Sequence, residues 1–212
     1  MAVTWWSDRV VPHLTDVALR SREIGELRDE TCSGLRGRVL EIGFGSGLNI
    51  RFYPAAVTSV AAVEPSDVGW KLSAERRAYT GVPIQRSGLD GQHLAEVDDS
   101  FDSALVTFSL CTIPDPALAL SEVRRVLRPG ASLHFLEHGL APDAGVARWQ
   151  RRLDPVQQRV FAGCHLSRDI PGLVGAAGLE VTELRAEYQP GPRVMRPWVH
   201  GYIGRAVRGG AA

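Results

Sequence analysis

The sequence predicts an α/β fold: a seven-stranded, mostly parallel sheet with helices on both faces. Short apolar runs alternate with amphipathic segments five times along the chain, and two further strand-like runs follow. This alternation is typical of parallel strands joined by crossover helices. The 212 residues are enough for one such domain with a substantial core.

The first elements can be predicted from periodicity and turn residues. Residues 4–32 have apolar positions at helical spacing, and Pro12 is expected to bend or restart this helical segment. The apolar run Arg38–Ile42 leads directly into a glycine cluster, which indicates a buried strand ending in a tight turn. A helix is expected over 48–53, because Pro54 would stop it.

The middle of the chain continues the same alternation. Val57–Val63 is a second apolar strand, and Ser66 is the expected N-cap of a helix over 67–79. The next expected elements are strands over 82–85 and 101–108, a helix over 117–127, a turn at 128–130 and a strand over 131–136.

The last quarter is less regular. Residues 139–166 are polar and rich in arginine, and we expect an inserted helical region there. Ser167 is expected to cap a short helix over 168–177, and strands over 179–188 and 194–207 are expected to close the sheet.

Composition excludes several classes of protein. The 24 basic and 24 acidic residues balance, which argues against a nucleic-acid partner. The three cysteines are odd in number and widely spaced without CxxC or Cys/His metal spacing, so we expect neither a disulfide scaffold nor a metal site. The amino terminus does not resemble a signal peptide, and no apolar run approaches the roughly 18 residues of a membrane span, so a cytoplasmic protein is expected.

The most informative segment is Glu41-Ile42-Gly43-Phe44-Gly45-Ser46-Gly47. A glycine-rich turn after a parallel strand lets backbone amides approach a ligand closely. Glu64 ends the second strand, 21 residues after Gly43, where an acid can accept both hydroxyls of a ribose. The spacing is G-x-G-x-G, whereas a dinucleotide fingerprint requires G-x-G-x-x-G, and position 48 is leucine. A turn without any ligand is the alternative.

This segment resembles motif I of class I S-adenosylmethionine-dependent methyltransferases. Ser100-Phe101-Asp102 and the run from Arg124 to Gly130 resemble later motifs of the branch typified by quinone and sterol methyltransferases. The resemblance implies a Rossmann-like sheet with an antiparallel last strand, and S-adenosylmethionine as cofactor. It also implies one methyltransferase domain over 1–212, with a helical cap (1–36), a cofactor-binding core (37–138), an acceptor-side insertion (139–168) and a closing helix and strands (169–208).

The same resemblance implies cofactor-binding residues. Glu41 is expected to orient the turn and to reach the ammonium side of the methionine, Glu64 to bind the ribose, and Asp90 to accept from the adenine amino group. Asp90 could instead be a simple turn residue. The full set of expected cofactor-binding residues is Glu41, Gly43, Phe44, Gly45, Gly47, Asn49, Glu64, Pro65, Asp90, Gly91 and Thr107.

The region after the fifth strand resembles a narrower group, the methyltransferase-like thiol S-methyltransferases. The matching stretches include Glu137-His138, Gly163-Cys164 and Leu166-Ser167-Arg168. The resemblance implies a small, lipophilic thiol as acceptor, although we expect no apolar amino-terminal anchor of the kind found in that group. Methylation of a phospholipid amine is a neighbouring alternative. Aromatic and aliphatic residues could line the acceptor pocket, or could simply belong to the core: Trp5, Trp6, Phe108, Ile113, Trp149 and Phe161.

A thiol acceptor must lose its proton, because the thiolate is the nucleophile. His138, just after the fifth strand, is the expected base, with His165 and Asp98 as weaker candidates. A hydrogen-bonded structural histidine is the alternative for His138. Two other functions also remain open: a nicotinamide-dependent oxidoreductase, and a relative that binds adenosylmethionine without catalysis.

Charge is unevenly divided along the chain. Residues 1–147 hold 14 cations and 19 anions, whereas residues 148–212 hold 10 cations and 5 anions. The acidic part contains the expected site of the sulfonium cofactor. The basic part contains the expected acceptor-side insertion, where a solvated surface and weak attraction to an anionic membrane are both open. The sequence leaves the oligomeric state undetermined.

Overall fold

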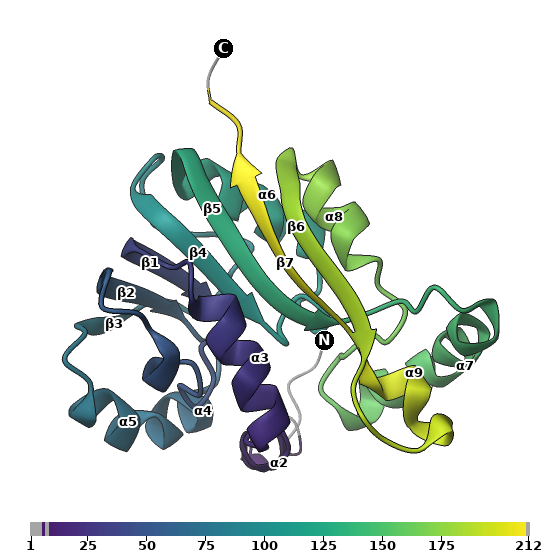
Figure 1. Ribbon diagram of the computed structural model, residues 1–212. Coiled ribbons are helices and arrows are strands. Elements are labelled where there is room, and N and C mark those ends of the chain that lie inside the picture. The colour runs from purple at the N-terminus through teal and green to yellow at the C-terminus, as the bar shows by residue number, and fades with distance from the viewer. Residues whose placement is uncertain (1–5, 7–8, 211–212) are drawn as a thin grey trace.

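The computed structural model describes Trp6 and residues 9–210 and contains one seven-stranded sheet (Figure 1). The strand order is β3-β2-β1-β4-β5-β7-β6. The first five strands in this order pair in parallel, and β7 is antiparallel to both of its neighbours. The predicted mostly parallel sheet with an antiparallel last strand is therefore confirmed. The strands are β1 (Gly37–Ile42), β2 (Val57–Val63), β3 (Ile84–Gly88), β4 (Phe101–Thr107), β5 (Leu127–His138), β6 (Leu179–Tyr188) and β7 (His200–Arg208).

Helices cover both faces of the sheet. In Figure 1, α3 (Arg22–Cys32) crosses in front of the strands, while α6 (Pro116–Val126) and α8 (Ile170–Ala176) lie behind them. The central strands β1 and β4 are almost wholly buried, because side chains on both of their faces meet a helical layer. Large core residues such as Phe101 and Phe135 are completely buried.

The amino-terminal helical region is two helices, α2 (Val11–Ala18) and α3, where the sequence predicted one segment. Pro12 lies in the first turn of α2, so it restarts the helix, as expected for a residue without an amide donor. Ser21 Oγ accepts from the amide of Ile24 and caps α3.

Two other predicted helices differ in extent. The helix expected over 48–53 is only a 3-10 turn, η1 (Ile50–Phe52). Ser66 caps a helix through the amide of Gly69, as predicted, but the helix divides at Ser73 into α4 (Asp67–Leu72) and α5 (Ala74–Tyr79). The Ser73 hydroxyl donates to the carbonyl of Trp70, a local bond that competes with continuous helix.

Two predictions near the carboxyl terminus were wrong. Ser167 does not cap α8, because its hydroxyl donates to Asp154, and Asp169 accepts from the amide of Gly172 instead. The strand expected over 194–207 begins only at His200. The residues before it form η2 (Arg193–Met195) and α9 (Arg196–Val199), where Pro197 could not have joined a strand ladder.

Smaller shifts affect the other elements. Residues 128–130 are part of the long strand β5, whereas we expected a separate turn. The expected strand over 82–85 begins later, at Ile84. The predicted inserted region contains one long helix, α7 (Ala144–Val160), which lies beside α9 and away from the sheet in Figure 1. Among the described residues, no helix is long and apolar enough to cross a membrane.

Candidate active site

The glycine turn follows β1 at the carboxyl edge of the sheet, between β2 and β4. Gly43, Gly45 and Gly47 all have positive φ angles, of 72°, 57° and 75°. A Cβ atom at Gly43 would lie 1.8 Å from the Ser109 hydroxyl oxygen, so the turn and the loop after β4 could not approach this closely with any other residue. The turn therefore lies where open parallel sheets bind ligands.

Glu64 is attached to this turn. Its Oε2 accepts from the amide of Gly45 at 2.6 Å, and its Oε1 accepts from the amide of Ser66 at 2.7 Å. Burial raises the pKa of Glu64, although both amide hydrogen bonds favour the ionised form. The structure thus brings together two of the residues that the sequence assigned to one site.

Glu41 lies behind the turn and is completely buried. Its two oxygens accept from the Asn49 side-chain amide and from the Tyr53 hydroxyl. Burial raises the pKa of Glu41 to about 7, against the opposing effect of these hydrogen bonds. These partners follow the turn in sequence, and both expected roles of Glu41, orienting the turn and reaching the cofactor's ammonium group, stay predictions.

Arg28 on α3 joins the same network and was missed from the sequence. Its Nη1 donates to Asn49 Oδ1 at 2.5 Å and to Thr107 Oγ1 at 3.0 Å, while its buried Nε has no hydrogen-bond partner among the described residues. Burial lowers the pKa of Arg28 to about 10, so it remains a cation at neutral pH. One signal was available in the sequence. Gly25, Arg28 and Cys32 form a buried stripe on a helix that was predicted, and Arg28 is the charged residue in that stripe.

Asp16 on α2 was also missed, and it connects the helical cap to the turn. Its Oδ1 accepts from the Ser46 hydroxyl at 2.6 Å and lies 3.1 Å from Arg76 Nη2, while Oδ2 pairs with Arg20. Although burial alone would raise the pKa of Asp16, the Ser46 hydrogen bond and the two arginines lower it. No sequence pattern separates Asp16 from the other acids of the cap.

A cavity of 580 Å³ borders this region, and cationic side chains are prominent in its lining. It extends from Gly47 and Leu48 of the glycine turn to α3 and α5. The arginines that line it are Arg20, Arg28, Arg51 and Arg76. Arg20 and Arg76 are already paired with Asp16, and Glu75 also lines the cavity, so the lining carries charges of both signs.

The remaining predicted cofactor residues occupy different environments. Phe44 is buried, and its ring lies 5.5 Å from that of Trp70, so only its backbone can face a ligand. Pro65 is exposed after β2. Asp90 is exposed after β3, and its hydrogen bond with His93 holds its pKa below the ordinary value. A Cβ atom at Gly91 would lie 2.9 Å from Ile42, so this loop packs against the end of β1.

The expected acceptor-pocket residues lie in different environments, and Ile113 is half-buried against the core. Trp5 lies outside the described residues. Trp6, Trp149 and Phe161 are exposed, and the Trp6 ring nitrogen donates to the carbonyl of Val160. Phe108 lies next to Arg28, whose guanidinium carbon is 5.3 Å from its ring centroid. The two weaker candidates for the base form hydrogen bonds with other side chains. Asp98 accepts from Arg125, and the His165 ring bonds to the Gln158 side-chain amide.

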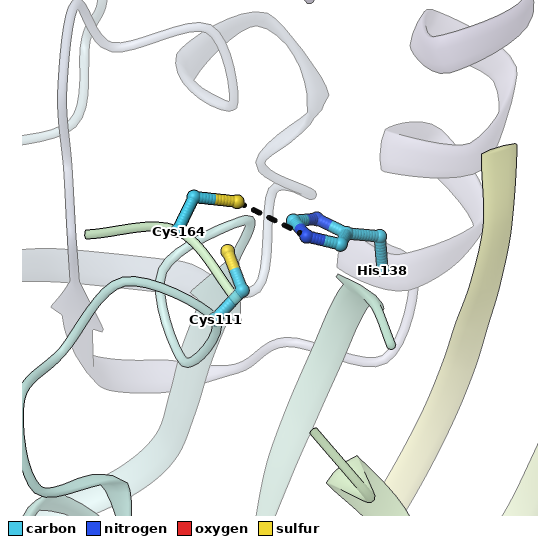
Figure 2. A group of neighbouring side chains, drawn as sticks. All are labelled: Cys111, His138 and Cys164. Atoms are coloured by element: carbon cyan, nitrogen blue, oxygen red, sulfur yellow. Dashed lines mark hydrogen bonds between the residues drawn. The ribbon is translucent and has the colours of Figure 1, made fainter. Parts of the chain in front are cut away.

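His138 does not join the glycine turn, and contacts two cysteines instead. Its Nε2 lies 3.1 Å from Cys164 Sγ, and Figure 2 shows the sulfur atom of Cys111 directed toward the same point. Burial alone would lower the pKa of His138, but the hydrogen bond with Cys164 and the neighbouring charges raise it. The sequence missed this cluster, because its three residues come from three separate segments.

Comparisons with known proteins identify the family. The methyltransferase-domain family matches residues 40–135, which include the glycine turn and Glu64. Thiol S-methyltransferase TMT1B of Rattus norvegicus is 32% identical over 196 residues, which are 89% of this chain and 78% of the relative.

The chain belongs to the S-adenosylmethionine-dependent methyltransferases.

A further relative and a solved structure are also similar to this methyltransferase. Phosphatidylethanolamine N-methyltransferase of Cereibacter sphaeroides is 27% identical over 149 residues, 69% of this chain and 72% of the relative. The solved structure of a methyltransferase from Thermotoga maritima superposes with a TM-score of 0.66 at 20% identity, covering 95% of this chain and 97% of the other, and shows the shared fold. The comparisons give no support to a nicotinamide-dependent oxidoreductase.

The residues present fit S-adenosylmethionine. The glycines leave space for close approach to the turn, and the Glu64 carboxylate is held at its edge by two amides. The buried, unpartnered Nε of Arg28 supplies a donor that suits a carboxylate such as that of the cofactor's methionine.

Proposed function

We propose that this methyltransferase transfers the methyl group of S-adenosylmethionine to the sulfur atom of a small, lipophilic thiol. The observation that carries the proposal is the similarity to a thiol S-methyltransferase over 89% of the chain. That similarity extends beyond the cofactor-binding core, and therefore includes segments that are expected to contact the acceptor. A fold alone would not support any choice of acceptor.

In this proposal, three groups of residues hold the cofactor. The amides of the Gly43–Gly47 turn face its methionine part, with Arg28 near the carboxylate. Glu64 accepts from the ribose hydroxyls, and Asp90 accepts from the adenine amino group. Glu41 fixes Asn49 behind the turn and does not need to touch the cofactor.

The bound cofactor supplies an electrophilic methyl group on a sulfonium sulfur. The acceptor sulfur forms a new S–C bond as the S–CH₃ bond breaks, so the products are a thioether, S-adenosylhomocysteine and one proton. The protein can accelerate this step by holding the acceptor in line and by excluding water. His138 is the predicted base for the acceptor proton, but to act it would have to release Cys164.

A direct test is methyl transfer from isotopically labelled S-adenosylmethionine to matched acceptors. We expect a labelled thioether from benzenethiol and from alkyl thiols, and no product from phenol or aniline. Labelled phosphatidylethanolamine with no labelled thioether would contradict the proposal. That outcome would favour N-methylation of a phospholipid, the activity named for the Cereibacter sphaeroides relative.

We further propose that α7 contacts an anionic membrane surface. Trp149, Val156 and Val160 recur at helical spacing on one exposed face of α7, and Phe161 follows at its end. Arginines accompany this face, and the Arg152 guanidinium lies 5.6 Å from the Trp149 ring centroid. An exposed apolar stripe flanked by cations is typical of helices that lie in a membrane interface. We also propose that the protein is cytoplasmic, a location that is compatible with reversible contact between α7 and a membrane.

Vesicle sedimentation tests this contact. We expect binding to vesicles that contain phosphatidylglycerol, and little binding to pure phosphatidylcholine. Trp149→Ser should weaken binding by roughly tenfold, since it removes one large interfacial side chain. Tyr79→Ser is the matched control, because Tyr79 is an exposed aromatic residue on α5. Equal binding by the Trp149 variant and the unaltered protein would refute the contact.

A further inference from the structure

Cys111, His138 and Cys164 form a compact group of metal-ligating side chains at one edge of the sheet. Their ligand atoms, two Sγ and one imidazole nitrogen, all lie within 4.8 Å of one another. Figure 2 shows the three side chains converging on a common point. Both cysteines are buried, and His138 is half-buried. Among the described residues, no further histidine, cysteine or acid joins this group.

The loops that carry the three residues are tied to one another. The amide of His165 donates to the carbonyl of Cys111 at 2.8 Å, which joins the loop after α7 to the loop after β4. Arg168 Nη1 donates to the carbonyl of Ile113 at 2.6 Å, and Glu137 Oε1 accepts from the amide of Leu110 at 3.0 Å. The cluster is therefore positioned by backbone contacts, as well as by its own side chains.

The chain adopts an unfavourable conformation to bring Cys164 into the cluster. Ala162 and Gly163, the two preceding residues, have φ angles of 49° and 92°. A left-handed alanine is uncommon, because its Cβ atom crowds the backbone. The surrounding contacts hold this strained turn in place, and strain of this kind is concentrated at functional sites.

We propose that Cys111, His138 and Cys164 bind a zinc ion. Two thiolates and an imidazole are a ligand set that zinc prefers. With Zn–S distances of about 2.3 Å and Zn–N distances of about 2.0–2.1 Å, tetrahedral ligands lie roughly 3.5–3.8 Å apart. The present separations, up to 4.8 Å, differ from this by a small side-chain rotation. Binding displaces one proton from each thiol to solvent.

The zinc ion would have a role in the proposed reaction, and this part of the inference rests on the proposed thiol methylation. Three protein ligands leave one tetrahedral position open, as in catalytic zinc sites. An acceptor thiol that binds there loses its proton to solvent, because zinc stabilises the thiolate. The sulfur then forms its bond to the methyl carbon while the sulfonium S–C bond breaks. His138 is a metal ligand in this scheme and not the base.

The cluster also lies close to the cofactor site along the chain. Cys111 is two residues from Ser109, whose hydroxyl packs against Gly43 of the glycine turn. His138 follows Glu137, which accepts from the amides of Ser109 and Leu110. A sulfur bound at the open position would thus approach from the loops after β4 and β5.

Metal content is the first test. The full-length protein, isolated under reducing conditions without chelators or a metal-affinity tag, should contain one zinc ion per chain by inductively coupled plasma mass spectrometry. Cys111→Ser and Cys164→Ser should each reduce the zinc content or affinity by about tenfold or more. Cys32→Ala is the matched control, because Cys32 is buried in the core beside Leu35 and Val39. Circular dichroism checks that each variant is folded.

Cobalt substitution is the second test and reports on ligand identity. We expect the visible bands of tetrahedral cobalt and thiolate-to-cobalt charge transfer in the unaltered protein and in Cys32→Ala, and their loss in Cys111→Ser and Cys164→Ser. Benzenethiol should increase the charge-transfer absorption, whereas phenol should not. A folded, reduced protein that retains no zinc and gives no cobalt bands would overturn the inference. So would a zinc-free protein that is isolated with a Cys111–Cys164 disulfide.

The two proposals can fail separately. Protein that is isolated without zinc and gives no cobalt bands, yet converts thiols to thioethers, would refute the metal site and leave the proposed function intact. Zinc-loaded protein that binds S-adenosylmethionine by calorimetry, but methylates no thiol, would refute the proposed acceptor and leave the metal site intact.

Discussion

Glu64, which we propose as the ribose ligand, is held in place by the backbone. Its carboxylate is anchored by the amides of Gly45 and Ser66, so its position is set before any ligand arrives. Each carboxylate oxygen has a second lone pair that can accept from a hydroxyl. A preorganised acceptor of this kind binds without the entropic cost of ordering a flexible side chain.

Glu64→Ala should therefore weaken the binding of S-adenosylmethionine. The expected loss is about 1.5–3 kcal/mol, the range for hydrogen bonds to a charged group. Isothermal titration calorimetry with S-adenosylmethionine and S-adenosylhomocysteine measures it. Asp67→Ala is the control, since Asp67 is a nearby exposed acid that pairs with Arg86. An unchanged dissociation constant for Glu64→Ala would remove Glu64 from the ribose site.

Glu41 should make the stability of the protein depend on pH. Its pKa is about 7 in the folded protein, above the ordinary value of 4.5. The folded state therefore keeps this proton at pH values where the unfolded state has released it. The associated stability is fully present below about pH 4.5 and is lost as pH rises to about 7, by up to about 3 kcal/mol.

Glu41→Gln should abolish this contribution. Urea unfolding between pH 4.5 and 8 should show that the free energy of unfolding falls less steeply in the variant than in the unaltered protein. A pH-independent offset is also expected, because glutamine cannot accept from both Asn49 and Tyr53. Glu26→Gln, at an exposed site on α3, is the control. Identical slopes would show that Glu41 is ionised in both states throughout this range.

At the scale of elements, α2 is held to the glycine turn largely through Asp16. The helix is only eight residues long, so tertiary contacts must stabilise it. Asp16 provides a bond to Ser46 in the turn and ion pairs with Arg20 and Arg76. The helical cap and the cofactor site are thereby coupled.

Asp16→Asn should release α2 from the turn. We expect the protection of residues 11–18 against amide hydrogen exchange to fall by about 1–3 kcal/mol at neutral pH, the cost of losing a charged hydrogen-bond acceptor. Because the folded pKa of Asp16 is lowered, its contribution is present above about pH 3.8 and is lost as pH falls through the folded pKa. The difference between the two proteins should shrink over that acidic range. Arg22→Gln, which breaks an exposed pair on α3, should change little.

The sequence predicted elements well where one physical signal dominated. The strands β1, β2 and β4 are apolar runs buried on both faces, and each was predicted within one residue of its bounds. The strand predicted over 194–207 was wrong at its start, because residues 194–199 belong to η2 and α9. The secondary structure of so short an element depends on its packing against α7, and the periodicity of its own sequence does not contain that information.

The site was predictable only where its residues are adjacent in the chain or belong to a known motif. The sequence placed the glycine turn and Glu64 together in this way, and the structure joins them through the amide of Gly45. Arg28 and Asp16 reach the turn from helices that precede it, so only the fold brings them there. The same holds for Cys111, His138 and Cys164, whose separations in sequence match no metal-binding motif.

At the scale of the whole molecule, β7 lies between β5 and β6 and must fit against both. Gly204 is at a tight point, where a Cβ atom would lie 2.3 Å from the Phe135 ring. The ring is part of the buried core and cannot move away freely.

Gly204→Ala should lower the free energy of unfolding by about 1–3 kcal/mol through overpacking. Chemical denaturation measures this change. Gly145→Ala is the control, because no atom of the described part of the chain lies within 4 Å of the Cβ position at Gly145. A Gly204 variant as stable as this control would show that β5 and β7 can separate without cost.

The position of β7 also affects how the protein is made. During synthesis β6 emerges from the ribosome before the strand that connects it to the rest of the sheet. Until residues 200–208 have emerged, β5 presents an unpaired edge and β6 has no neighbour, and exposed edges of this kind invite association with other chains. Truncation within β7 should therefore yield aggregates and not a smaller folded enzyme.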